Sequence, residues 1–408
     1  MAGPAIEDYG VVAKNDDNPA VIMNANKIHR RQGFKSKDFD NILNNIQHAR
    51  QLGLKVTGYF CPLVTEELIL ASGMFPLRLP LIPTGSSIGE KPGKCWQACS
   101  VQHKTNLAEG LDLNVLDSLI ITCPENDSYT ATHCFKECFD QSIFTLELPR
   151  VNRYRSDYKA TAKFRHNLKM LAKNLGQFNR QPINIINLSK AITQSDKIKE
   201  LLRGLYEYPI RGRSPVEWQD VFKLQQAGYS LERPVFKRNL LEHQDKLAQI
   251  NLMGLPVDAK PRLMLAGFIS NELLELVKGS NAVIVTDYSC SGSMLLRKRV
   301  PVFGFPAPFD YLVERYLYNA PCLYMEDYTA QKYRMITTAR RYNVHGLVFY
   351  GPQEYKPLMK SYEALGDALY HELAIPPVFI DSSLVYTNTS DIQERLNNFI
   401  DIIGGRIG

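Results

Sequence analysis

The stretch RLMLAGFISNELLELVKGSNAVIVTDYSCSG, from Arg262 to Gly292, decides the fold of this chain. It contains two apolar runs, Leu263 to Ala266 and Ala282 to Val285, separated by an amphipathic segment over Leu273 to Val277. Two buried strands that flank a helix of this length form a βαβ unit, and its right-handed crossover makes the strands parallel neighbours. The stretch therefore predicts an α/β fold built on parallel sheets.

Polar and small side chains follow the second of these strands. Asp287, Cys290 and Gly292 come directly after it in the chain. In open α/β sheets, ligands bind at the carboxyl ends of the strands. A cysteine presented there between small residues is a candidate functional thiol.

Strand and helix patterns alternate in two parts of the chain. The first part has apolar runs at residues 55–60, 75–81, 116–122 and 142–148, and the second adds strands at 346–350 and 378–381 to the pair described above. Alternation of this kind is typical of parallel α/β domains. We predict an N-terminal arm and helix over residues 1–50, a first α/β lobe over 51–155, a helical linker region over 156–260 and a second α/β lobe over 261–408.

Composition sets limits on function. Hydrophobic residues make up 45% and charged residues 22% of the 408 residues, as in soluble globular proteins. The net charge of +6 is spread along the chain, which favours an anionic ligand such as a coenzyme A ester or a nucleotide and gives no case for nucleic acid. No run reaches the roughly 18 apolar residues of a membrane helix, and the N-terminus lacks a signal-peptide pattern. We expect a cytoplasmic protein without a membrane partner.

The cysteines are the strongest chemical signal. There are eight: Cys61, Cys95, Cys99, Cys123, Cys134, Cys138, Cys290 and Cys322. In a cytoplasmic chain they are expected as thiols or as metal or cluster ligands rather than disulfides. Two pairs lie four residues apart, which is not the CxxC spacing of zinc ribbons or ferredoxins. Their positions at predicted strand ends and in loops are more informative, because such thiols can converge between two lobes. Cys61 is interpreted as a buried core cysteine.

Other chemistries find less support in the residues. A thiol nucleophile would need a histidine base such as His103 or His133, and nothing in the sequence fixes their geometry. There is no GxGxxG motif or P-loop, so ATP hydrolysis would fall to a partner. Glu66 and Glu67 stand at a predicted helix start, where their charge offsets the helix dipole. Glu67 is the candidate for a catalytic proton transfer.

The order of motifs resembles the superfamily of 2-hydroxyacyl-CoA dehydratases, benzoyl-CoA reductases and double-cubane-cluster proteins. The resemblance covers roughly residues 40 to 405, and the order is more specific than any single motif. The stretches that carry it are GYFCPLVTEELILASGMFPLRL (58–79), CSVQHKTNLAEG (99–110), LIITCPENDS (119–128), RLMLAGF (262–268), VIVTDYSCSG (283–292), NAPCLY (319–324), RRYNVHGLVFYG (340–351), AIPPVFIDSSL (374–384) and DIQERLNNFIDII (391–403).

This resemblance implies a fold, a cofactor and partners. The fold is two Rossmann-like, or flavodoxin-like, lobes with an iron–sulfur cluster between them, either [4Fe–4S] or double-cubane [8Fe–9S]. The partners are a homologous second subunit, in a heterodimer or homodimer, and an ATP-hydrolysing iron–sulfur activator. The reaction is one-electron reduction of an acyl-CoA-type substrate, leading to 2-hydroxyacyl-CoA dehydration or aryl-CoA reduction in an anaerobic setting. The implied ligands are Cys99, Cys123, Cys290 and Cys322, with Cys134 and Cys138 in reserve.

The sequence departs from the family pattern at three places. Tyr350 stands where the family usually has a cysteine, Pro124 replaces the acid after Cys123, and the threonine that precedes Arg395 in the helix motif is missing. One reading is a rewired cluster in which Cys95, Cys134 or Cys138 substitutes. The alternative is a cluster-deficient structural or electron-relay subunit that pairs with a cluster-bearing paralogue. A third reading is a metal-free thiol hydrolase or transferase.

Overall fold

The computed structural model describes residues 36–79, 113–124, 128–136, 139–149, 157–211, 213–214, 216–250, 255–256, 260–267, 269–296, 307–319, 327–351, 356–381 and 388–407. The predicted N-terminal arm, over residues 1–35, lies outside the described residues.

Two parallel sheets form the framework, and they share one topology. The first contains β1 (Val56–Tyr59), β2 (Phe75–Arg78), β3 (Ser118–Pro124) and β4 (Ser142–Leu148), in the order β2-β1-β3-β4. The second contains β7 (Arg262–Gly267), β8 (Val283–Tyr288), β9 (Gly346–Gly351) and β10 (Pro377–Asp381), in the order β10-β9-β7-β8. In chain order each sheet therefore reads 2-1-3-4, which is the flavodoxin-like arrangement. The predicted fold class is confirmed.

Helices connect the strands and link the two sheets. They are α1 (Ser36–Gln51), α2 (Glu66–Ala71), α5 (Ser128–Lys136), α6 (Tyr158–Phe178), α7 (Ile185–Tyr206), α8 (Trp218–Gly228), α9 (Arg233–Ile250), α10 (Asn271–Lys278), α11 (Pro308–Val313), α12 (Tyr328–Arg341), α13 (Lys356–Leu373) and α14 (Thr389–Ile407). Four begin at a polar cap, because the side chains of Asp157, Asn184, Ser270 and Asp327 each accept a hydrogen bond from a backbone N–H three residues on.

Shorter elements complete the chain. Helical turns of the 3₁₀ type cover Leu113–Val115, Tyr208–Arg211 and Ser293–Leu296, a π-helical turn covers Glu314–Asn319, and a small antiparallel pair joins β5 (Arg213–Ser214) to β6 (Leu255–Pro256). The π-helical turn and the small pair were not predicted from the sequence.

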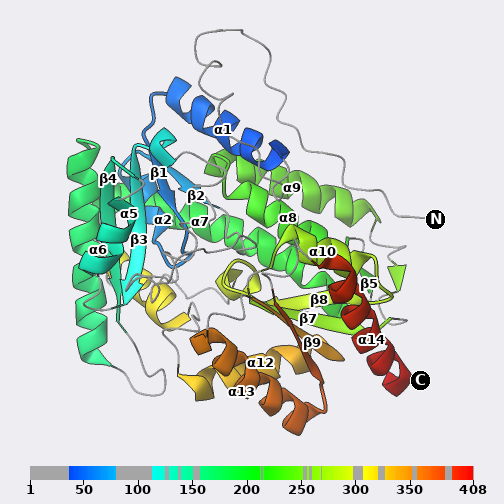
Figure 1. Ribbon diagram of the computed structural model, residues 1–408. Coiled ribbons are helices and arrows are strands. Elements are labelled where there is room, and N and C mark those ends of the chain that lie inside the picture. The colour runs from blue at the N-terminus through cyan, green and yellow to red at the C-terminus, as the bar shows by residue number, and fades with distance from the viewer. Residues whose placement is uncertain are drawn as a thin grey trace.

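Each sheet is covered by helices on both faces, so its strands are apolar on both sides. Helices α1 and α5 pack on one face of the first sheet, and α2 and α6 pack on the other. Helices α10 and α14 cover one face of the second sheet, and α12 and α13 cover the other. Figure 1 shows the two sheets with the green helices α7, α8 and α9 between them.

Helix α7 joins the cores of the two lobes. Leu188 and Ile192 near its start pack in the core of the first lobe, whereas Ile198 and Leu202 further along pack in the core of the second. A helix of this length spans about 33 Å, which is enough to reach both.

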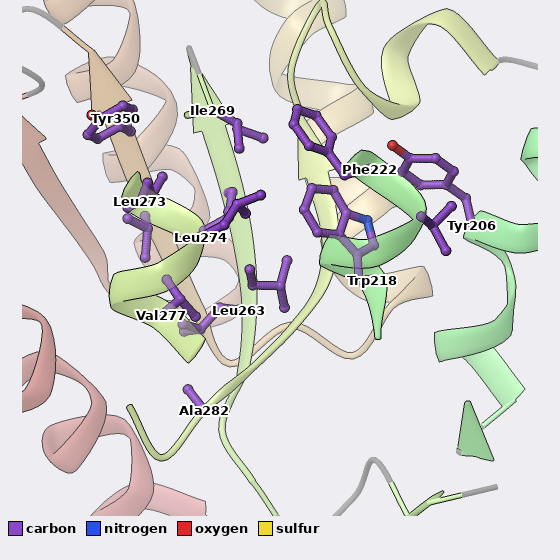
Figure 2. Packing of buried hydrophobic residues seen from close by; sticks show 14 of the residues in the cluster. Tyr206, Trp218, Phe222, Leu263, Ile269, Leu273, Leu274, Val277, Ala282 and Tyr350 are labelled. Carbon is purple, nitrogen blue, oxygen red and sulfur yellow. The ribbon is translucent and has the colours of Figure 1, made fainter. Parts of the chain in front are cut away.

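Aromatic side chains extend the core of the second lobe into the helical region. Trp218 stacks on Phe222 with ring centroids 5.2 Å apart and meets Tyr206 edge-on at 5.9 Å. Figure 2 shows these rings beside Leu263 and Ile269 of the second lobe.

The segment from α11 to the π-helical turn crosses back to the first lobe. Its side chains Tyr311, Leu312 and Leu317 pack in the same core as α2 and α6. The first sheet lies within residues 51–155 and the second within 261–408, while the domain boundaries themselves stay a prediction.

We expect Gly267→Ala to destabilise the protein strongly. Gly267 ends β7 with a φ of +103°, and a Cβ atom there would collide with the backbone carbonyl oxygen of Tyr350. We expect the free energy of unfolding to fall by about 2 kcal/mol or more.

The matched control is Gly405→Ala in α14, where a Cβ atom meets nothing within 4 Å. This substitution should be neutral or stabilise by up to about 1 kcal/mol. Chemical denaturation measures both variants, and equal stabilities would contradict the assigned geometry of Gly267.

Candidate functional site

The carboxyl end of the first sheet faces a turn that belongs to the second. Cys61 follows β1, Arg78 ends β2, and Cys290 sits in the turn after β8. The electrostatic neighbours of the Cys290 thiol include Cys61 and Arg78 from the first lobe and Asp287 from its own strand. Side chains at strand ends of both sheets therefore influence one another electrostatically, at an edge where ligands bind in open α/β folds.

The turn that carries Cys290 is held by hydrogen bonds on two sides. The Asp287 carboxylate accepts hydrogen bonds from the backbone N–H groups of Ser289 at 3.0 Å and Ser293 at 2.9 Å. From the helical region, the Gln226 side chain donates to the carbonyl oxygen of Ser291 at 2.8 Å. The position of the thiol is thus fixed by its own lobe and by α8.

Burial dominates the ionisation of groups in this turn. It raises the pKa of Cys290 to about 12, with a further increase from Cys61, while Arg78 acts in the opposite direction. Burial also raises the pKa of Cys61, and a hydrogen bond with Thr122 opposes that change. Both thiols are therefore protonated at neutral pH unless a metal or another cation displaces the proton.

Arg78 is buried, with 6% of its surface exposed, and carries a positive charge. Its guanidinium carbon lies 5.1 Å from the centre of the Tyr229 ring. Neither of its terminal nitrogens, Nη1 and Nη2, has a hydrogen-bond partner in the part of the chain that the structure describes.

Glu66 is the centre of a buried ion pair beside this site. Its Oε2 atom accepts hydrogen bonds from Arg233 Nη2 at 2.8 Å and from the Tyr59 hydroxyl at 3.0 Å, and its Oε1 accepts from Ser195 Oγ at 3.0 Å. Burial alone would raise the pKa of Glu66, but Arg233 and Lys199 outweigh it and hold the pKa well below its usual range. The carboxylate is therefore charged at every physiological pH.

Glu67, the candidate for catalytic proton transfer, is completely buried in a second cluster. Its Oε2 accepts a hydrogen bond from the Tyr316 hydroxyl at 2.8 Å, and its Oε1 lies 3.3 Å from Arg315 Nη1 and 3.7 Å from Lys199 Nζ. Arg315 also pairs with Asp196 of α7. These contacts give Glu67 a structural role between the lobes, and a proton-transfer role stays a prediction.

Lys199 is the titratable member of this cluster. Burial and the charge of Arg315 lower the pKa of Lys199 to about 8, although Glu67 and Glu66 act in the opposite direction.

The cysteines predicted as ligands differ in burial and in the part of the fold where they lie. Cys290 is half-buried at the inter-sheet edge, as its position in the sequence indicated. Cys123 is 2% exposed and packs in the core beside α1 and α5, on the face of the first sheet opposite Tyr59. Cys134 lies in α5, and its side chain is outside the described residues. Also outside them are Cys95, Cys99, Cys138 and Cys322.

Tyr350 fills the position of the missing family cysteine. Its ring is completely buried in the core of the second lobe, and its hydroxyl accepts a hydrogen bond from Ser270 Oγ at 3.2 Å. Figure 2 shows it at the end of its strand, near Ile269.

The sequence does not single out two participants in this region. Cys61 packs against the core of the first lobe, as predicted, and is in addition electrostatically coupled to Cys290. Arg78 was not singled out, although a lone arginine at the end of an apolar strand is a detectable signal. Arg315 lies in the unpredicted π-helical turn, and nothing in the local sequence indicated its contact with Glu67.

Two flavodoxin-like sheets with thiols at facing strand ends define a two-lobed α/β protein with a candidate redox or metal site between the lobes. The sequence matches the family of 2-hydroxyglutaryl-CoA dehydratase D-components over residues 61–403. The chain belongs to this family, so the resemblance found in the sequence and the predicted enzyme class, a dehydratase component, are both confirmed.

A curated relative supports the same assignment. The chain is 24% identical over 397 residues to the (R)-phenyllactyl-CoA dehydratase beta subunit of Clostridium sporogenes, covering 90% of this chain and 98% of that protein. The relative is thus a subunit of a dehydratase.

Similarity to solved structures is slight. A mutant laminin-binding adhesin (Lmb) from Streptococcus agalactiae is 10% identical with a TM-score of 0.21, covering 87% of this chain and 100% of the adhesin chain. ZnuA is 12% identical with a TM-score of 0.20, covering 85% and 99%. Scores this low carry no argument about fold or function.

No described helix has the length and apolarity needed to cross a bilayer. Within the same ranges, no group of three or more His, Cys, Asp or Glu side chains is arranged to hold a metal ion.

We expect Asp287→Asn to change the pH dependence of stability. Burial raises the pKa of Asp287 to about 7 from 3.8, so the folded state binds a proton that the unfolded state has released between these values. The free energy of unfolding should therefore fall as pH rises from about 4 to 7, by up to about 1.4 kcal/mol per pH unit from this group. Urea unfolding across this range, compared with the variant, measures the difference, and parallel curves would contradict it.

We expect Arg233→Met to cost about 3–5 kcal/mol, because it leaves the Glu66 charge buried and unpaired. The control is Lys223→Met. Its ion pair with Glu275 has the same 2.8 Å separation but is exposed, so the loss should stay below about 1 kcal/mol. Equilibrium unfolding of both variants tests this, and similar losses would show that burial does not govern the first pair.

Proposed function

We propose that this chain is the iron–sulfur subunit of an ATP-dependent 2-hydroxyacyl-CoA dehydratase system. Membership in the dehydratase family supports the reaction class. The observation that carries the proposal is that Cys290, in a turn fixed by hydrogen bonds of Asp287 and Gln226, is electrostatically coupled to Cys61 and Arg78 at strand ends of the first sheet. We propose an acyl-CoA thioester as substrate, and the relative's name favours an aromatic 2-hydroxyacyl group. The proposal also includes reduction of an aryl-CoA, in place of dehydration of a 2-hydroxyacyl-CoA.

Two described thiols at this edge, Cys290 and Cys61, are electrostatically coupled and could each supply a ligand to an iron–sulfur cluster, whose remaining ligands would have to come from elsewhere in the chain. The neighbouring Arg78 charge would favour an anionic group there. The proposed ligands are Cys99, Cys123, Cys290 and Cys322, with Cys134 and Cys138 in reserve. We add Cys61 to these candidates because it is electrostatically coupled to Cys290. A cluster held there would supply single electrons at low potential.

The proposed reaction conserves electrons overall. One electron added to the thioester carbonyl gives a ketyl radical anion, hydroxide leaves C2, a proton leaves C3 and the electron returns. The products are an enoyl-CoA and water. A separate ATP-hydrolysing activator would supply the electron, and a homologous second subunit would complete the complex. The beta-subunit name of the relative supports the latter.

The protein's own residues would position this chemistry. The hydrogen bonds of Asp287 and Gln226 fix the turn that carries Cys290. Cys290 itself is half-buried, so its thiol is partly shielded from water. The paired charges of Glu66 and Glu67 hold the lobes in register around the site.

A second candidate is a cluster-deficient structural or relay subunit. The buried ring of Tyr350 at an expected ligand position favours it, as does the core packing of Cys123. In this reading a paralogue with the full ligand set would hold the cluster.

Iron and acid-labile sulfide content of anaerobically purified protein separates the two candidates. The first predicts about four irons per chain for a single cubane or about eight for a double one, with a visible and EPR spectrum. Cys290→Ser should remove at least about half of the iron, because one thiolate ligand is lost.

The matched control is Ser291→Ala, which alters the same turn without touching a thiol and should retain its iron. An iron-free, well-folded wild-type chain would leave the second candidate standing.

A further inference from the structure

Arg78 is a buried cation without an acidic partner among the described residues. Its side chain is 6% exposed, and both terminal nitrogens lack hydrogen-bond acceptors. Burying a charge with unsatisfied donors is costly, and native structures rarely leave such groups unpaired. A guanidinium in this state is explained when a ligand supplies the missing acceptor.

The neighbouring Arg233 shows what an arginine with an anionic partner looks like in the same surroundings, although its Nε also lacks a hydrogen-bond partner among the described residues. Both guanidinium groups lie over the Tyr229 ring, at 5.1 Å for Arg78 and 5.5 Å for Arg233. Arg233 donates to the Glu66 carboxylate at 2.8 Å and to the Leu231 carbonyl oxygen at 2.7 Å. The aromatic ring is therefore common to both, and of the two arginines Arg78 is the one without an anionic partner in the ranges that the structure describes.

Tyr229 adds a second unpartnered donor to the same place. Its hydroxyl is buried and has no hydrogen-bond partner in the described ranges. Burial raises the pKa of Tyr229 to about 12, so the hydroxyl keeps its proton at neutral pH. The surroundings of Arg78 thus offer hydrogen-bond donors and a positive charge.

The neighbouring carboxylates that the structure describes have other partners, and none of them pairs with Arg78. Glu66 is taken by Arg233, and Glu67 by Arg315 and Lys199. Asp287 accepts hydrogen bonds from its own turn.

We propose that Arg78 is an oxyanion-binding residue whose terminal nitrogens donate to a carboxylate or to the charged oxygen of an acyl group. Two parallel N–H groups of a guanidinium match the two lone pairs of a planar oxyanion. The proposal deepens the proposed function, because negative charge develops on the thioester oxygen when it accepts an electron.

The test uses the iron-free full-length chain and small anions as probes, so its result does not depend on a cluster. Sodium acetate should raise the midpoint of thermal unfolding saturably, relative to sodium chloride at equal ionic strength, and titration calorimetry should give the same affinity. In Arg78→Met the affinity should fall at least about tenfold, because charge-assisted hydrogen bonds are lost. The acetate affinity of Arg78→Lys should lie between those of wild type and Arg78→Met, since a single ammonium charge replaces the two parallel N–H groups of the guanidinium.

Stability without any anion gives a second readout. Arg78→Met should raise the unfolding midpoint by about 3 °C or more, because an unpaired buried charge is removed. Arg233→Met, which removes a paired charge beside the same ring, should lower it. A higher unfolding midpoint for Arg78→Met together with a lower one for Arg233→Met would distinguish a ligand-binding arginine from a structural one. A lower midpoint in both variants would overturn the proposal.

Other outcomes also decide the question. Equal acetate binding by wild type and Arg78→Met would overturn the proposal, as would binding of inorganic phosphate without acetate. Loss of the acetate response on iron loading would assign Arg78 to the metal centre instead. Iron content of separate, anaerobically purified wild-type protein keeps the two hypotheses apart. If that protein holds no iron while the iron-free chain binds acetate, this inference stands and the proposed function fails; if it holds iron while the iron-free chain does not bind acetate, the reverse is true.

Discussion

A buried network of three carboxylates and three cations holds the lobes together. Its members are Glu66, Glu67 and Asp196 on one side and Arg233, Lys199 and Arg315 on the other. Their charges cancel, so each tolerates burial only while its partner is present. The network ties α2 of the first lobe to α7, α9 and the π-helical turn. The placement of Tyr59, Tyr229 and Arg78 at the edge of the first sheet depends on it.

The sequence predicted the sheets well and the site only in part. Runs such as Leu119 to Ile121 are buried on both faces, so local hydrophobicity identifies them as strands. The contact of Glu67 with Arg315 joins residues 248 positions apart, and no local pattern encodes it. Cys61 packs against the core of the first lobe, as a buried cysteine usually does, whereas its electrostatic coupling to Cys290 depends on how the two lobes pair, which no local pattern encodes.

The two sheets share one topology but have diverged at corresponding positions. In each, the switch in strand order falls between the first and third strands. The first sheet places Cys61 there. In the second, Gly267 lets the backbone approach the carbonyl oxygen of Tyr350, whose ring is buried in the core of that lobe. The first sheet therefore contributes a thiol and a positive charge, and the second contributes a thiol from a strand at its margin.

The hydrogen bonds from α8 to the Cys290 turn bear on how the two lobes can move. Gln225 and Gln226 donate to carbonyl oxygens of Gly292 and Ser291, so the turn is anchored outside its own sheet. Because α8 packs in the core of the second lobe, these bonds hold the turn within that lobe and would move with it. The contact that a hinge motion would break is the buried ion pair of Glu66 in α2 with Arg233 in α9. Separating the lobes would leave both charges without their partners, and this cost opposes such a motion.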